Sequence, residues 1–148
     1  MLPLFGGAPE YLLNALQVQQ LKAARFVCGY KSYYWSTKKL LNTCGWLYVK
    51  QQEFHSTTLL AHTIATTSLP HNIHSDMFQP YNVHTRAASQ GQILYGVQYR
   101  GENVMKRGSF KYRAQQYNLT IPRDMKIKSL GISKSRLKKH ANQEIPVR

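Results

Sequence analysis

Acidic residues are scarce in this chain. Six Asp and Glu stand against 20 Lys and Arg, which gives a formal charge of +14 over 148 residues. Such an excess repels itself in a compact fold and favours a polyanionic partner, either nucleic acid or an anionic lipid surface. The hydrophobic content of 43% is too high for a disordered chain, so the sequence predicts one folded domain with a modest core.

Cysteine is almost absent, with only Cys28 and Cys44, and neither has a Cys-x-x-Cys neighbour. We interpret them as reduced thiols of an intracellular protein, in the nucleus or cytoplasm. His71 and His74 fit no zinc-finger spacing with these cysteines, so no metal site is expected. Both cysteines are expected near helix C-termini, whose negative end disfavours a thiolate, so no catalytic residue is assigned.

Long hydrophobic runs are also missing, and none approaches the length of a membrane span. The N-terminal residues lack a basic segment, and Gly6, Gly7 and Pro9 break their apolar run, which argues against a signal peptide. The pair Gly6-Gly7 has no following Gly-Lys-Ser/Thr, so no phosphate-binding loop is expected.

The sequence does contain the pattern of helices, namely apolar residues every three or four positions bounded by capping residues. The sequence predicts a mostly α fold: a small helical domain with a long N-terminal helix, an irregular middle segment and a basic C-terminal helical module. The corresponding regions are residues 1–67, 68–105 and 106–148. Within the first region, a helix begins near Pro9 and ends at Gly29. Its expected inward residues recur every three or four positions, namely Leu13, Leu16, Gln20, Ala23 and Val27.

A second short helix is expected after an aromatic link, with Ser36 or Thr37 as its N-cap and Gly45 as its end. Leu40 and Leu41 should be buried in it. A third helix is expected over 49–66. The residues assigned to the core around and within this helix are Trp46, Leu47, Val49, Leu59, Leu60 and Ile64.

The middle region is predicted to be a loose connector with a turn of helix near 72–77. Residues 93–99 could form a strand or an anchored loop, and the loop is favoured because the rest of the chain shows helical signals. Ser109 is expected to cap a helix through Tyr117, with Phe110, Ala114 and Tyr117 on one side. A helical turn over 122–127 and a last helix over 133–141 complete the prediction.

Positive charge is concentrated at the C-terminal end. Residues 100–148 carry 13 basic and 3 acidic residues, whereas the first 99 carry 7 and 3. Tyr112 and Tyr117 lie among these cations, and aromatic rings beside Lys and Arg can stack on bases. A solvated face without a partner is the alternative. The residues expected to contact nucleic acid are Lys22, Arg25, Lys106, Arg107, Lys111, Arg113, Lys134, Arg136, Lys138 and Lys139.

Three segments of the chain match known sequence patterns in order. Residues 6–29, GGAPEYLLNALQVQQLKAARFVCG, fit L-Q-x-x-Q-x-K-A-A-R-x-x-x-G, and residues 36–51, STKKLLNTCGWLYVKQ, fit T-x-x-L-L-x-x-x-G-W-L-x-V. Residues 108–122 and 129–139 are similar to S-F-x-x-R-A-x-x-x-W-N-x-L-P and L-x-x-F-K-x-x-L-K. Together they resemble the C-terminal region of reverse transcriptases from non-LTR (LINE-type) retrotransposons, where the first pattern is a helix just beyond the polymerase palm.

The chain departs from this family pattern in three ways. Tyr117 replaces the usual Trp, and Ser133 replaces a Phe that anchors the last helix, which predicts a weakly docked helix there. Asp76 and Asp124 are the only aspartates and are isolated in sequence, so the Tyr/Phe-x-Asp-Asp palm that holds two Mg²⁺ ions is missing. The resemblance implies a start beyond the palm, with Met1 as an internal start.

The resemblance therefore implies a fragment or remnant of an RNA-directed DNA polymerase that contacts RNA or DNA through its thumb-like part. Its partners would be nucleic acid and the palm of a parent polyprotein, and Mg²⁺ would belong to that palm. The chain alone should be inactive as a polymerase. The alternative is an autonomous basic nucleic-acid-binding or structural protein. A peripheral membrane binder is disfavoured, because Leu137 is the only large apolar residue of the sequence SKSRLKKHA.

Overall fold

The structure is a computed structural model, and it describes residues 7–29, 33–78, 109–122 and 134–144. The described residues form helices and no strand, which confirms the mostly α fold. The helices are α2 (Glu10–Cys28), α3 (Thr37–Cys44), α4 (Val49–Thr67), α5 (His71–Met77), α8 (Phe110–Thr120) and α9 (Lys134–Glu144).

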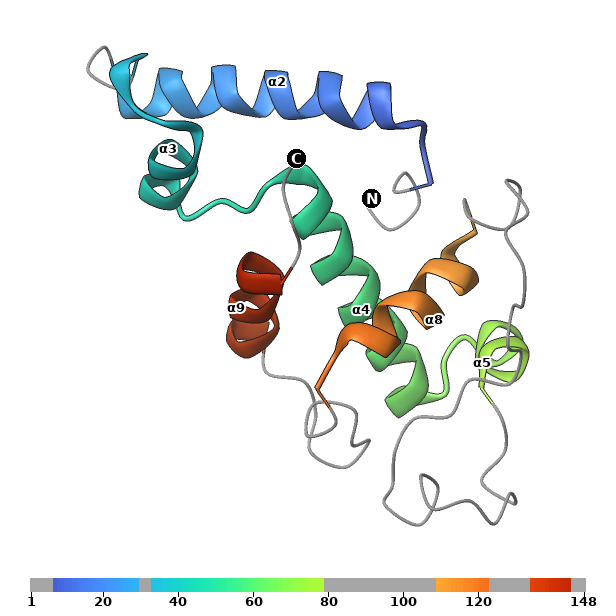
Figure 1. Ribbon diagram of the computed structural model, residues 1–148. Helices are drawn as coiled ribbons and strands as arrows, with labels where there is room; N and C mark the ends of the chain where they lie inside the picture. The colour runs from blue at the N-terminus through green and yellow to red at the C-terminus, as the bar shows by residue number, and fades with distance from the viewer. Residues whose placement is uncertain (1–6, 30–32, 79–108, 123–133, 145–148) are drawn as a thin grey trace.

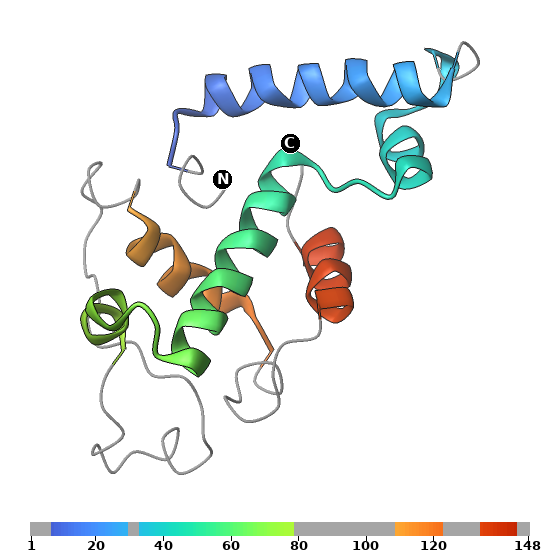
Figure 2. The same ribbon diagram turned by 180° about the vertical axis from the view of Figure 1, so that it is seen from behind.

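Helix α4 is the axis of the molecule, because α2, α5, α8 and α9 all pack against it (Figures 1 and 2). Helix α3 packs instead on α2, and together they form an upper layer above α4 and α9 in Figure 1. The C-terminal helices α8 and α9 thus share a core with α4, although more than 40 residues separate them from it in sequence.

Three groups of buried apolar side chains hold these contacts. Leu47 and Phe54 meet Leu137 and Ala141 of α9, with Ile121 beside them. The far end of α4 forms a second group with α5 and α8, and Ala24 with Leu40 and Leu41 joins α2 to α3 in the third. Full burial of each large apolar side chain contributes about 1.5–3 kcal/mol, so these groups account for the packing of the helices.

The predicted N-caps and glycine ends are confirmed where the chain is described, but the helix predicted to end at Tyr117 is α8, which continues to Thr120. Ser36 Oγ accepts a hydrogen bond from Lys39 N–H, and Ser109 Oγ accepts one from Tyr112 N–H. Gly29 and Gly45 follow α2 and α3 with φ of 75° and 67°, a region that favours glycine. The short helix expected near 72–77 is α5.

The inward face predicted for the first helix is only partly correct. Gln20 does face the rest of the fold and donates to Leu47 O, but Leu16 and Val27 are exposed, and Ala24 is the buried residue of α2. The buried face differs from the predicted one because α3 covers Leu21, Ala24 and Cys28. The segment between α3 and α4 in turn forms hydrogen bonds with Gln17 and Gln20. Leu60 of α4 was also assigned to the core, but it is exposed.

The weak docking predicted for the last helix is wrong too. Leu137 and Ala141 are fully buried against Phe54 and Leu47, so these two positions anchor α9 without an aromatic residue at 133. The helix begins at Lys134 and ends at Glu144, three residues beyond the predicted end.

Several predictions fall outside the described residues. They are the contacts of Lys106 and Arg107, the loop over 93–99, most of the turn over 122–127 and most of the connector between the first and last regions.

Candidate functional site

The corner between α3 and α4, residues 45–49, is held by two glutamines of α2. Gln20 Nε2 donates to Leu47 O at 2.9 Å, and Gln17 Oε1 accepts from Val49 N–H at 2.8 Å. Gln17 also donates to Gln20 at 3.0 Å. Residues three apart lie on one face of a helix, so this spacing lets both amides reach one stretch of backbone. The pair satisfies an N–H of the first turn of α4, which has no partner within its own helix.

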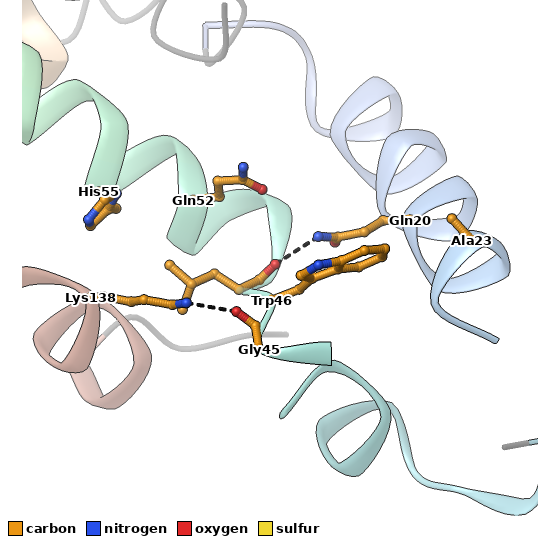
Figure 3. Close-up of a pocket in the computed structure, with 8 residues that line it drawn as sticks. Gln20, Ala23, Gly45, Trp46, Gln52, His55 and Lys138 are labelled. Atoms are coloured by element: carbon orange, nitrogen blue, oxygen red, sulfur yellow. Dashed lines mark hydrogen bonds between the residues drawn. The ribbon is translucent and has the colours of Figure 1, made fainter. Parts of the chain in front are cut away.

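A cavity of about 510 Å³ lies at this corner, where four elements meet. Figure 3 shows the lining residues, which come from α2, the corner, α4 and α9. The lining residues are Gln20, Ala23, Gly45, Trp46, Leu47, Gln52, His55 and Lys138. The cavity therefore combines an indole, apolar walls, amides, an imidazole and an ammonium group.

Trp46 is the largest side chain of this cavity, and its predicted place in the core is wrong. It is 38% exposed, whereas its neighbour Leu47 is buried beside Phe54. The left-handed Gly45 turns the chain between α3 and α4, so Leu47 enters the core while the partly exposed indole of Trp46 lines the cavity. Part of the indole is thus open to a planar ligand.

Lys138 brings a positive charge to the same corner. Its Nζ donates to Gly45 O at 2.7 Å, as Figure 3 shows, and so neutralises part of the negative C-terminal end of α3. An ammonium group has three donors, and the Lys138 side chain is exposed. It can therefore keep the backbone contact and still bind an anion.

The basic residues of α8 and α9 that were predicted to contact nucleic acid differ in their surroundings: those of α8 form ion pairs with acidic residues, and those described on α9 are exposed. Lys111 pairs with Asp76, and Arg113 pairs with Glu53, so these charges are already compensated. Arg113 is only 6% exposed, which removes it from the set of residues available to a phosphate. Arg136 and Lys139 of α9 are exposed, as is Lys138.

Lys22 and Arg25 lie on α2, and neither lines the cavity. Lys22 is exposed and Arg25 is half-buried. For Lys134 the structure describes only the backbone, at the first residue of α9. Arg136, Lys138 and Lys139 thus lie on α9, where only Lys138 lines the cavity, and Lys22 and Arg25 lie on a separate helix.

Tyr117 belongs to the buried network around Glu53. The Tyr117 hydroxyl and the Arg113 guanidinium both donate to the Glu53 carboxylate, and Thr57 Oγ1 donates to it at 3.0 Å. Burial raises the pKa of Tyr117 far above its usual value, and the charge of Glu53 raises it further. Tyr117 therefore stays protonated as a donor, and its ring packs on Phe54. This position does not suit the base stacking predicted for it.

Sequence reasoning missed the cavity residues Trp46, Gln52 and His55. The Gly45-Trp46 pair could have indicated that Trp46 is exposed, because a left-handed glycine reverses the chain and can turn the next side chain outward. The polar Gln20 in an otherwise apolar stripe was a second signal, since it marks a side chain that needs a hydrogen-bond partner.

Within the described ranges, no group of three His, Cys, Asp or Glu side chains lies close enough to hold a metal ion. No helix of this part of the chain has the length and apolar character needed to cross a membrane.

Comparison of the chain with protein-family models, with curated proteins and with solved structures found no match.

Proposed function

We propose that this protein binds single-stranded nucleic acid at the corner between α3 and α4, through backbone phosphates and one unpaired base. The observation that carries the proposal is the half-exposed indole of Trp46 in a cavity whose wall includes Lys138. Base stacking on an aromatic ring tolerates any sequence, and a lysine beside the ring neutralises the phosphate that accompanies the base.

The charge balance supports a polyanionic ligand. In the described part of the chain, ion pairs engage Glu10, Glu53 and Asp76, which are half of the six acidic residues. The exposed cations of α9 thus lie in a molecule with a large uncompensated positive charge. Gln52 and His55 add polar groups that suit the edge of a base rather than a hydrocarbon chain.

We further propose that the chain is the thumb-like, post-palm part of a retrotransposon RNA-directed DNA polymerase. The ordered match of three sequence segments supports this, and the glutamines of its L-Q-x-x-Q motif have a structural task here in holding the corner. In this proposal the chain grips RNA or DNA, and the chemistry with its Mg²⁺ ions belongs to a separate palm. The exposed apolar side chains on α2, including Leu12, Leu16 and Phe26, offer a surface for that palm.

The alternative is an autonomous basic nucleic-acid-binding protein. The full burial of Leu137 and Ala141 favours it, because the C-terminal helix completes a core with α4 without another chain. Sequencing the genomic DNA upstream of the Met1 codon separates the two proposals. A frame encoding a Tyr/Phe-x-Asp-Asp palm supports the polymerase origin, and a promoter without any trace of a palm supports the autonomous protein.

Replacing Trp46 with alanine is expected to weaken binding of a single-stranded oligonucleotide by about 1–3 kcal/mol, roughly 5- to 150-fold in Kd, because one stacked base is lost. Binding of a duplex should change little, because paired bases cannot enter the cavity. Fluorescence anisotropy with a labelled oligothymidylate measures the affinity.

Phe26 provides the matched control for this variant. It is an aromatic residue that is 90% exposed and lies outside the cavity, so Phe26→Ala should leave single-strand affinity unchanged. Equal losses in the two variants, or no loss in Trp46→Ala, would refute the stacking site.

A further inference from the structure

The thiols of Cys28 and Cys44 lie side by side at the junction of α2 and α3. Their Sγ atoms are 3.2 Å apart, and both cysteines are half-buried and free. Cys28 is the last residue of α2 and Cys44 the last residue of α3. A disulfide has a sulfur–sulfur distance of about 2.05 Å, so the two atoms need to approach by only ~1.2 Å.

The packing of the two helices keeps the thiols in this position. Ala24, Leu40 and Leu41 are buried between α2 and α3, and Leu21 and Trp35 pack around them. Cys44 Sγ also lies 3.9 Å from Ala24 O, one turn before Cys28 on α2. The backbone on both sides is helical, so the pair is preorganised rather than brought together by a chance loop conformation.

We propose that Cys28 and Cys44 form an oxidation site, which a hydroperoxide converts into an intramolecular disulfide between α2 and α3. The thiolate of one cysteine attacks the peroxide oxygen, which breaks the O–O bond and gives a sulfenic acid and an alcohol or water. The second thiol then attacks that sulfur and displaces water. The two sulfurs lose two electrons in total, and the peroxide accepts them.

The thiol–thiol contact also affects the protonation of the pair. The hydrogen bond with Cys28 raises the pKa of Cys44, and burial and the charge of Cys28 raise it further. Either thiol can react first with the peroxide, because the other lies 3.2 Å away and can then attack the sulfenic acid. The geometry assigns these cysteines a role beyond that of the inert thiols expected from the sequence.

The disulfide would also stabilise one wall of the cavity. Ala23 and Gly45 line it, and they adjoin Ala24 and Cys44, which lie at the contact between the two helices. Oxidation would then fix α2 against the corner and hold Trp46 in its exposed position. This consequence rests on the proposed nucleic-acid binding, whereas formation of the disulfide rests on the thiol geometry alone.

The test is oxidation of the full chain with hydrogen peroxide at low protein concentration. The expected product is a monomer that has lost two hydrogens from its intact mass. Trypsin cleaves after Arg25, Lys31, Lys39 and Lys50, so residues 26–31 and 40–50 should appear as one linked peptide without reductant. Dithiothreitol should separate them. Two free thiols after treatment, or a disulfide only between two molecules, would overturn the proposal.

Thermal unfolding gives a second readout. Closing a loop of this length should raise Tm by about 10 °C, and dithiothreitol should reverse the rise. Cys28→Ser and Cys44→Ser are the controls, because each keeps one thiol and should show no oxidation-dependent rise. A rise of the same size in either single-thiol variant would also overturn the proposal. Binding of oligothymidylate, measured separately, tests only the consequence for the cavity.

Discussion

Replacing Arg113 with methionine is expected to lower the free energy of unfolding by about 3–5 kcal/mol, because it leaves the Glu53 carboxylate buried without its cationic partner. Glu53 is 3% exposed and Arg113 is 6% exposed, so water cannot replace the lost contact. Thr57 and Tyr117 still donate to the carboxylate, but neither carries a compensating charge. Urea unfolding followed by circular dichroism measures the change.

Two further variants make this prediction specific. Lys111→Ala, on the same helix α8, breaks the exposed pair with Asp76 and should cost at most about 1 kcal/mol. The double variant Arg113→Met with Glu53→Gln removes both charges and should recover most of the lost stability. A loss in Arg113→Met no larger than that in Lys111→Ala would show that the pair does not hold α8 on α4.

Nucleic-acid affinity is expected to fall roughly 100-fold when the salt concentration rises from 50 to 200 mM. The estimate assumes about five neutralised phosphates on a single strand, each of which contributes about −0.7 to the slope of log affinity against log salt. Exposed cations on α2, α3 and α9 can supply this number, namely Lys22, Lys38, Lys39, Lys138 and Lys139. Titrations with oligothymidylate at four or five salt concentrations measure the slope.

Single lysine variants test which charges contribute to that slope. Lys138→Ala should make it shallower by about one phosphate contact, because Lys138 lies exposed at the cavity. Lys50→Ala is the matched control, since Lys50 pairs with Glu10 at 2.6 Å and its charge is already compensated. An affinity that stays constant over this salt range would exclude phosphate contacts as the source of binding.

Local signals in the sequence predicted the helices well. Ser36 or Thr37 and Ser109 were predicted as N-caps, and Ser36 and Ser109 do cap their helices. Gly29 and Gly45 end theirs as predicted, because a cap depends on only a few neighbouring residues. The burial of Leu40 and Leu41 was also predicted. The caps follow from short-range chemistry, which the sequence displays directly, whereas the burial of Leu40 and Leu41 also depends on Ala24 of α2.

Which face of a helix is buried depends on partners that are distant in sequence, and here the predictions were wrong. The stripe predicted to face inward on α2 correctly included Gln20, but it also included Leu16 and Val27, which are exposed, and it left out Gln17, which hydrogen-bonds to the corner. Arg113 was predicted as a phosphate contact from its charge alone. The structure shows that Arg113 is buried against Glu53 of α4, a residue that lies 60 positions earlier in the chain.

The fold explains why the candidate site lies at the corner. Leu137 and Ala141 fix α9 on α4, and this position places Lys138 over the end of α3. Gln20 fixes the corner from the other side, and Gly45 directs Trp46 outward. The site thus depends on residues from α2, the corner, α4 and α9, and no short sequence motif contains all of them.

The central claim is that an unpaired base stacks on Trp46. The chain has two tryptophans, so Trp35→Phe leaves Trp46 as the sole indole, and its fluorescence reports on the cavity directly. Titration of this variant with oligothymidylate at low salt should quench the emission strongly and to saturation, and added salt should restore it. Binding detected by anisotropy without any change in Trp46 emission would contradict the account.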